Sequence, residues 1–71
     1  MIKLNEIIEV INQDFEGDVV DYGEVTEIIS DTLLIVNLQS DTSLYCKVRK
    51  EFGSWYIIED VEVPLDIKCR F

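Results

Sequence analysis

Several residue types that carry chemistry are absent or scarce in this chain of 71 residues, which has no histidine, two cysteines and three isolated glycines. Without histidine, the chain lacks the commonest general base and the commonest metal ligand. Neither a glycine-rich phosphate-binding loop nor a Gly-x-Ser-x-Gly motif is present. A chain of this size also has little room for a ligand pocket of roughly 300 Å3 or more inside its core. We therefore expect no enzyme and no cofactor.

The two cysteines, Cys46 and Cys69, are far apart in the sequence. A structural zinc site needs four ligands, which usually come as close pairs of cysteine or histidine. The chain cannot supply such pairs, so we expect no metal. Both cysteines fall at apolar positions of predicted strands, which favours buried, reduced thiols.

Long hydrophobic runs are also missing, because the longest unbroken ones, such as Leu33–Val36, contain four residues. A helix needs about 20 apolar residues to cross a bilayer. At the N-terminus, Asn5 and Glu6 interrupt what would be the apolar core of a signal peptide. We expect a cytoplasmic protein that has no membrane partner.

Negative charge is abundant and unevenly distributed. The net charge is −9, and residues 1–42 contain ten carboxylates but only one cation, Lys3. Residues 43–71 contain five acids and five bases. An excess of this kind repels nucleic acid and attracts basic protein surfaces. It also keeps a small domain soluble, for which a net charge of about −2 to −8 is common.

The first segment has the apolar spacing of an amphipathic helix, predicted over residues 4–16. The apolar positions recur at intervals of three and four, at Leu4, Ile7, Ile8, Ile11 and Phe15. Asn5 is the expected N-cap and Gly17 the expected stop. Val10 lies off this stripe and is expected to be half-exposed.

The rest of the chain is rich in β-branched and aromatic residues, with polar turns at short intervals. These features predict strands over residues 19–29, 33–38, 43–50, 54–59 and 61–70. The alternation slips near Gly23, where we expect a bulge or a kink. One domain of the α+β class follows, with the amphipathic helix packed on a four- to five-stranded antiparallel meander. The alternative is a small SH3-like or Sm-like β-barrel capped by the same helix.

An uninterrupted acidic run is the first candidate site. Seven acids fall within residues 14–31, with no lysine or arginine between them. Alternate residues of a strand are about 6.7 Å apart, close to the spacing of successive phosphates along a nucleic-acid strand. Such a row could imitate a phosphate backbone, or it could be a solvated face that blocks edge pairing. The acids expected to form a binding face are Asp18, Asp21, Glu24, Glu27 and Asp31.

Aromatic residues form a second candidate surface beside the basic residues of the second half. Tyr45, Phe52, Trp55 and Tyr56 fall near Lys47, Arg49 and Lys50. Trp55 is expected to fill the core. Tyr45 and Tyr56 are expected to be secondary anchors for a partner, because tyrosine is favoured at protein interfaces.

The landmarks Ser30-Asp31, Ser40-Asp41-Thr42, Trp55 and Ile67-Lys68 loosely resemble, in their order, those of the phage inhibitors of uracil-DNA glycosylase. The resemblance rests on scattered single residues, and no residue role is carried over from it. It is in keeping with a small acidic inhibitor of the phage or mobile-element type.

Two functional hypotheses follow. The first is a binding module that docks on a basic, nucleic-acid-binding protein and inhibits or regulates it, without binding nucleic acid directly. The second is a self-assembling accessory module, such as a homodimer, which pairs through its C-terminal strand.

Overall fold

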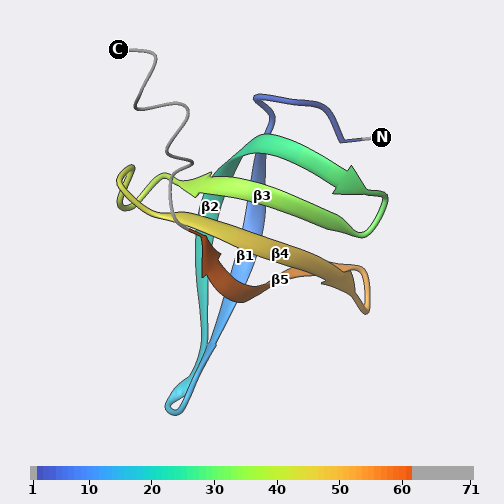
Figure 1. Ribbon diagram of the computed structural model, residues 1–71. Coiled ribbons are helices and arrows are strands. Elements are labelled where there is room, and N and C mark those ends of the chain that lie inside the picture. The colour runs from blue at the N-terminus through green and yellow to red at the C-terminus, as the bar shows by residue number, and fades with distance from the viewer. Residues whose placement is uncertain (1, 62–71) are drawn as a thin grey trace.

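The computed structural model describes residues 2–61, which form a closed barrel of five strands in chain order (Figure 1). The strands are β1 (Ile7–Asp14), β2 (Gly17–Ser30), β3 (Leu33–Leu38), β4 (Tyr45–Glu51) and β5 (Ser54–Val61). No helix occurs among these residues. The fold is therefore all-β, and the α+β class expected from the sequence is wrong. The expected strand over residues 61–70 and the position of Cys69 lie outside the described residues.

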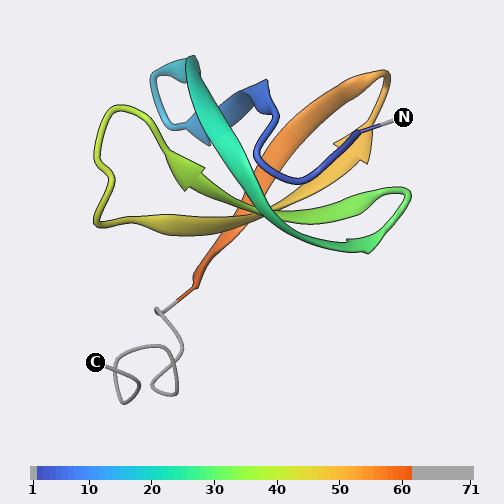
Figure 2. The same ribbon diagram turned by 90° about the horizontal axis from the view of Figure 1, so that it is seen from above.

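The barrel closes through a short parallel ladder. Consecutive strands are antiparallel, so the first and last of five strands must run in the same direction. β1 accordingly pairs in parallel with β5, with Val10 opposite Trp55 and Ile11 opposite Tyr56. Seen from above, the β2–β3 and β4–β5 turns lie on one side of the barrel and the β3–β4 loop on the other (Figure 2).

The predicted helix over residues 4–16 is replaced by β1 and the turn that follows it. Ile8 and Val10 point inward, and Val10 is 0% exposed, whereas Ile7 is 50% exposed and Phe15 protrudes fully into solvent. The segment around Val10 is rich in isoleucine and valine, whose branched side chains favour strands. Asn5 has a φ of 70° and donates its backbone N–H to Val25, so it caps no helix. The expected α+β fold and the alternative β-barrel both included this helix. Only the alternative β-barrel included a closed sheet.

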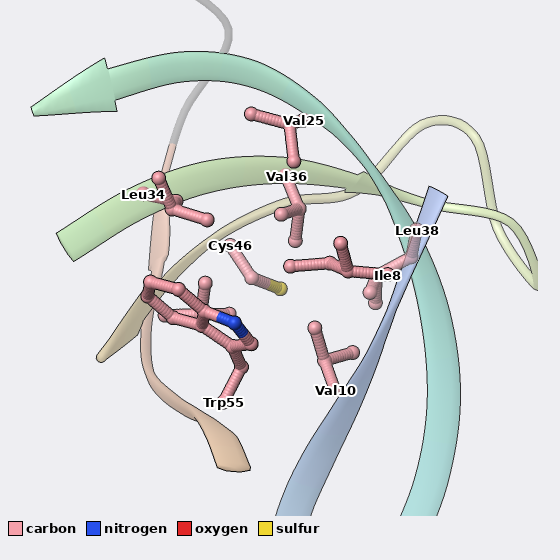
Figure 3. Packing of buried hydrophobic residues seen from close by; sticks show 9 residues of the cluster. Ile8, Val10, Val25, Leu34, Val36, Leu38, Cys46 and Trp55 are labelled. Atoms are coloured by element: carbon pink, nitrogen blue, oxygen red, sulfur yellow. The ribbon is translucent and has the colours of Figure 1, made fainter. Parts of the chain in front are cut away.

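The core is small and apolar, and every strand contributes to it (Figure 3). The nine buried side chains among residues 2–61 are Ile8, Val10, Val25, Leu34, Val36, Leu38, Cys46, Val48 and Trp55. Trp55 is in the core, as its size and apolar ring predicted. No charged or polar side chain among residues 2–61 is buried, so the core carries no candidate for chemistry other than the thiol of Cys46.

β2 is the longest strand, and it bends around the barrel. Gly23 lies opposite both Ile8 of β1 and Leu38 of β3. A Cβ atom at this position would stand 2.8 Å from Val36, so glycine allows the close approach of the two strands. The bulges occur later than expected, between Val25 and Glu27 and between Ile28 and Ser30. The slip at Gly23 thus reflects a packing contact and not a bulge.

None of residues 2–61 belongs to a helix long and apolar enough to cross a membrane.

Candidate functional site

A two-stranded hairpin arm projects from the barrel (Figure 1). We define the acidic arm as residues 12–22, the part of β1 and β2 beyond the ladders to other strands. β1 pairs with β5 only at Val10 and Ile11, and β2 pairs with β3 only from Gly23 onward. Among residues 2–61, residues 12–14 therefore pair only with residues 17–19 of the same hairpin. The arm gives the chain an element that is accessible from several sides.

The tip of the arm is a tight turn from Asp14 to Gly17. Asp14 and Gly17 are residues favoured at the first and last positions of a type I turn. The Asp14 carboxylate accepts a hydrogen bond from the Phe15 backbone N–H at 2.7 Å, and Gly17 adopts a φ of +125°. Phe15 stands at the apex with its ring in solvent. The result is an apolar ring presented between the carboxylates of Asp14 and Glu16.

The two predicted acids within the arm point in opposite directions. Side chains directly opposite one another in a ladder share a face. Asp21 lies opposite the buried Val10, so it is on the inward side, while Asp18 lies opposite Gln13 on the outer side. The Ser40 hydroxyl donates a hydrogen bond to Asp21 Oδ2 at 2.5 Å. Asp21 thus fastens the β3–β4 loop to the base of the arm, while Asp18 remains exposed.

The other three predicted acids lie away from the arm. Glu24 is half-buried on the outer wall beside Ile7, and Glu27 is exposed opposite Ile35. Asp31 is in the turn after β2. The five acids are distributed along β2 and the turn that follows it, over roughly 40 Å of chain at about 3.4 Å per residue, and β2 bends around the barrel between them. They do not gather into one compact face.

Within residues 2–61, no basic residue forms an ion pair with these five acids. The ion pairs within residues 2–61 are Lys47–Glu59 at 3.0 Å and Arg49–Glu51 at 3.7 Å. Both pairs lie on β4 and β5, so the cations of this half pair with acids of the same half. Among the described residues, none of the acids from Glu6 to Asp41 forms an ion pair. The negative field of the first half is therefore uncompensated in this part of the chain.

The two predicted tyrosine anchors lie on the outer wall and are half-buried. Tyr45 on β4 stands opposite Asn37 and Val61. Tyr56 on β5 lies beside Ile11 of β1, which in turn stands opposite Val20 of β2. Val20, Ile11 and Tyr56 therefore form an apolar row across three strands at the base of the arm. Only Tyr56, of the two tyrosines, adjoins the arm.

An open pocket of about 410 Å3 lies at the end of the barrel next to the β2–β3 and β4–β5 turns. It is larger than the sequence led us to expect, because it opens at the barrel end instead of being enclosed in the core. The Lys50 ammonium stands 5.9 Å from the centre of the Trp55 ring, a distance typical of a cation–π contact. The lining residues are Ile2, Ile28, Ser30, Asp31, Leu34, Lys50 and Trp55.

The buried thiol of Cys46 is poorly suited to nucleophilic chemistry. Burial, and secondarily the charges of Asp60 and Asp21, raise the pKa of the Cys46 thiol to about 11. Its S–H donates to Asp60 Oδ1 at 3.6 Å. The thiolate is the reactive form of cysteine, so this group stays inert near neutral pH. Residues 2–61 also contain no group of three or more side chains suited to holding a metal ion.

Asp41 has a structural role in the β3–β4 loop. Its carboxylate accepts hydrogen bonds from the Ser43 hydroxyl at 2.6 Å and from the Ser43 backbone N–H at 3.1 Å. These bonds hold the pKa of Asp41 below its usual range. With Asp21 bound to Ser40, two of the chain's acids hold the β3–β4 loop.

Comparison with protein-family models, with curated proteins and with solved structures finds no match for this chain. The assignment of a functional site therefore depends on geometry and charge. Sequence reasoning missed Phe15 and Val20 as surface residues, because the helical spacing placed Phe15 in the core. The Asp-x-x-Gly sequence of residues 14–17 was the signal for a hairpin tip.

Proposed function

We propose that this protein is a small acidic binding module of the cytoplasm, which docks on a basic surface of a nucleic-acid-binding protein and inhibits or regulates it. The observation that carries the proposal is the projecting acidic arm. It presents Asp14, Glu16 and Asp18 around an exposed Phe15, and residues 4–46 contain no lysine or arginine.

The arm combines two features of protein recognition. A field of one sign accelerates the encounter with a surface of the opposite sign and suppresses binding to like-charged surfaces. Aromatic side chains that enter a pocket of the partner supply much of the binding energy at interfaces. Phe15 is suited to such a role because its ring is fully exposed to solvent in the described part of the chain. The acids would then determine the association rate, and Phe15 would determine the lifetime of the complex.

The geometry favours electrostatic steering over imitation of a phosphate backbone. A phosphate-like row needs carboxylates on one face at alternate positions of a strand. Asp18 and Glu24 share the outer face but are six residues apart, and Asp21 faces inward. The proposal therefore relies on the charge and projection of the arm and not on regular spacing.

The test compares two charge-reversal variants that change the net charge equally. In the first, Glu16→Lys and Asp18→Lys act on the arm; in the second, Glu51→Lys and Glu59→Lys act on β4 and β5. Basic proteins captured at low salt and released at high salt supply the partner for measurements of association rate. We expect the arm variant to associate at least about tenfold more slowly at low salt, with a smaller effect of the control variant.

Two further results decide the proposal. Phe15→Ala should leave the association rate nearly unchanged and increase the dissociation rate, because it removes a short-range contact. Equal slowing by both charge variants would show that only net charge matters. A partner whose binding is insensitive to the arm variant and to salt would refute the proposed function.

A further inference from the structure

One edge of the arm has backbone groups that no strand of residues 2–61 engages. In antiparallel sheets, the N–H and C=O groups of alternate residues point toward opposite neighbours. Val25 of β2 exchanges hydrogen bonds with Asn5 and Glu6 on the β1 side. The Tyr22 carbonyl accepts from Gln39, on the side of β3. Even-numbered residues of this part of β2 therefore point away from β1.

The open edge consists of the backbone groups of Asp18 and Val20. Both residues are even-numbered, and the β2–β3 ladder begins only at Gly23. At Tyr22 the edge ends, because its N–H is bonded to Asp21 Oδ1 at 2.7 Å and its carbonyl to Gln39 at 2.8 Å. Two donors and two acceptors thus stand in register, at the spacing that an added strand requires.

We propose that this edge of β2 binds an extended basic segment of the partner as an additional β-strand. The inference rests on the proposed function and specifies how the partner is held. Strand addition draws affinity from main-chain hydrogen bonds and specificity from the side chains that alternate beside them. An open edge is otherwise a liability, and charged residues commonly protect it from unwanted pairing.

Charge complementarity determines the occupant. The edge lies within an acidic stretch that contains Asp14, Glu16, Asp18 and Asp21 and no cation. A second copy of the chain would bring the same acids into apposition, which disfavours self-pairing. A strand with lysine or arginine opposite Asp18, and an apolar residue opposite Val20, would complement the outer face of the arm. The fitting segment is therefore basic, has lysine or arginine two positions away from an apolar residue, and is about five residues long.

The test uses a synthetic eight-residue peptide in which pairs of lysines alternate with pairs of valines, so that residues two apart on one face are always one lysine and one valine. Its control has the same sequence and charge but is N-methylated at every amide, so that it cannot pair as a strand. Binding to the full chain is followed by amide chemical shifts and by hydrogen exchange. We expect slower exchange at the amides of Asp18 and Val20 with the first peptide, and affinity at least about tenfold lower for the methylated peptide.

A variant of the protein provides an independent test. Val20→Pro removes the backbone N–H of residue 20, which faces the open edge. The backbone hydrogen bonds of Val19 and Asp21 to β1 are kept. Val20→Thr is the control, because it preserves the backbone donor and the β-branched shape. We expect Val20→Pro to weaken binding of the unmethylated peptide by about tenfold, and Val20→Thr to change it little.

The outcomes separate this inference from the proposed function. Equal affinity for the two peptides, with arm-dependent and salt-sensitive binding, would refute strand addition and leave docking intact. Amides at Asp18 and Val20 that already exchange slowly in the free protein would show an occupied edge and also refute it. If neither peptide binds and no basic protein is captured, both proposals fail.

Discussion

At the scale of single residues, Phe52 occupies a backbone conformation that does not suit it. Glu51 pairs with Ser54, so Phe52 and Gly53 form a two-residue hairpin loop in which both have positive φ, 51° and 79°. Such a loop is the type I′ turn, for which Asn-Gly is the preferred sequence. A residue with a Cβ pays roughly 1–2 kcal/mol in this region, and asparagine tolerates it better.

Replacement of Phe52 by asparagine should therefore stabilise the fold by about 1 kcal/mol. Little packing would be lost, because Phe52 is 95% exposed. The free energy of unfolding in urea measures the change. Phe52→Leu is the control, since it removes the ring without relieving the backbone, and it should give no gain. Equal stabilisation by both variants would show that the gain comes from removal of the exposed ring and not from relief of the turn.

A second prediction at this scale concerns Cys46 and the stability of the fold at alkaline pH. Its thiol has a pKa of about 11 in the folded protein, against 9.0 for an ordinary thiol. The folded state therefore holds the proton more tightly than the unfolded state. The associated stability is fully present below pH 9 and is lost as the pH rises from 9 to 11. Urea unfolding of a Cys69→Ser background at several pH values between 8 and 11 measures this loss.

Other groups also titrate in that range, so the comparison is with Cys46→Val in the same background. Valine fills a similar space without an ionisable group. We expect the stability of the parent to fall more steeply with pH than that of the valine variant. Parallel pH profiles would show that the thiol does not contribute.

At the scale of elements, the arm should be separable from the barrel. Deletion of Asn12, Gln13, Asp18 and Val19 removes two opposed pairs and preserves the in–out alternation, since each strand loses two residues. The deleted pairs contact no third strand in the ladders of residues 2–61. We expect a loss of no more than about 1 kcal/mol in unfolding free energy, because exposed sites contribute little.

Val10→Ala is the reference for this experiment, since it lies on the same strand but inside the core. Loss of a wholly buried valine should cost about 2 kcal/mol, which is more than the deletion of four arm residues. The shortened chain should also lose its affinity for the lysine–valine peptide. A shortened protein that no longer folds would show that the arm is part of the barrel's stability.

The elements also show what could be predicted from the sequence. From residue 33 onward, the turns at Gln39–Thr42 and Phe52-Gly53 separate strands close to the expected ranges. Alternation is clear there because Cys46 and Val48 are flanked by Lys47 and Arg49. Around Ile8, by contrast, apolar residues occur at both helical and strand spacings. The predicted helix placed Ile8 and Ile11 on the same buried face, whereas the closed barrel has Ile8 and Val10 inside.

The candidate site was predictable only in composition. The absence of cations in residues 4–46 is evident from the sequence. Which acids face outward depends on the register of β1 with β2, and this register follows from the turn at Asp14–Gly17. A helix over the same residues concealed that turn, and with it the open edge at Asp18 and Val20.

At the scale of the whole molecule, a small barrel carries a large unbalanced charge. The longest dimension is 39 Å. The Debye length is about 30 Å at 0.01 M salt and about 10 Å at 0.1 M. At low salt, most of the carboxylates therefore repel one another across the molecule, and such repulsion destabilises the compact state.

Added NaCl should accordingly raise the melting temperature by several degrees between 0.01 and 0.5 M. The Glu16→Lys and Asp18→Lys variant reduces the net charge from −9 to −5, because each reversal adds two, and its melting temperature should depend less on salt. Scanning calorimetry of both proteins tests this expectation, and a flat or falling profile for the parent would contradict it. The same salt should weaken docking to a basic partner, since screening acts on attraction and repulsion alike. Because the two effects have opposite signs, loss of binding at high salt cannot be attributed to loss of the fold.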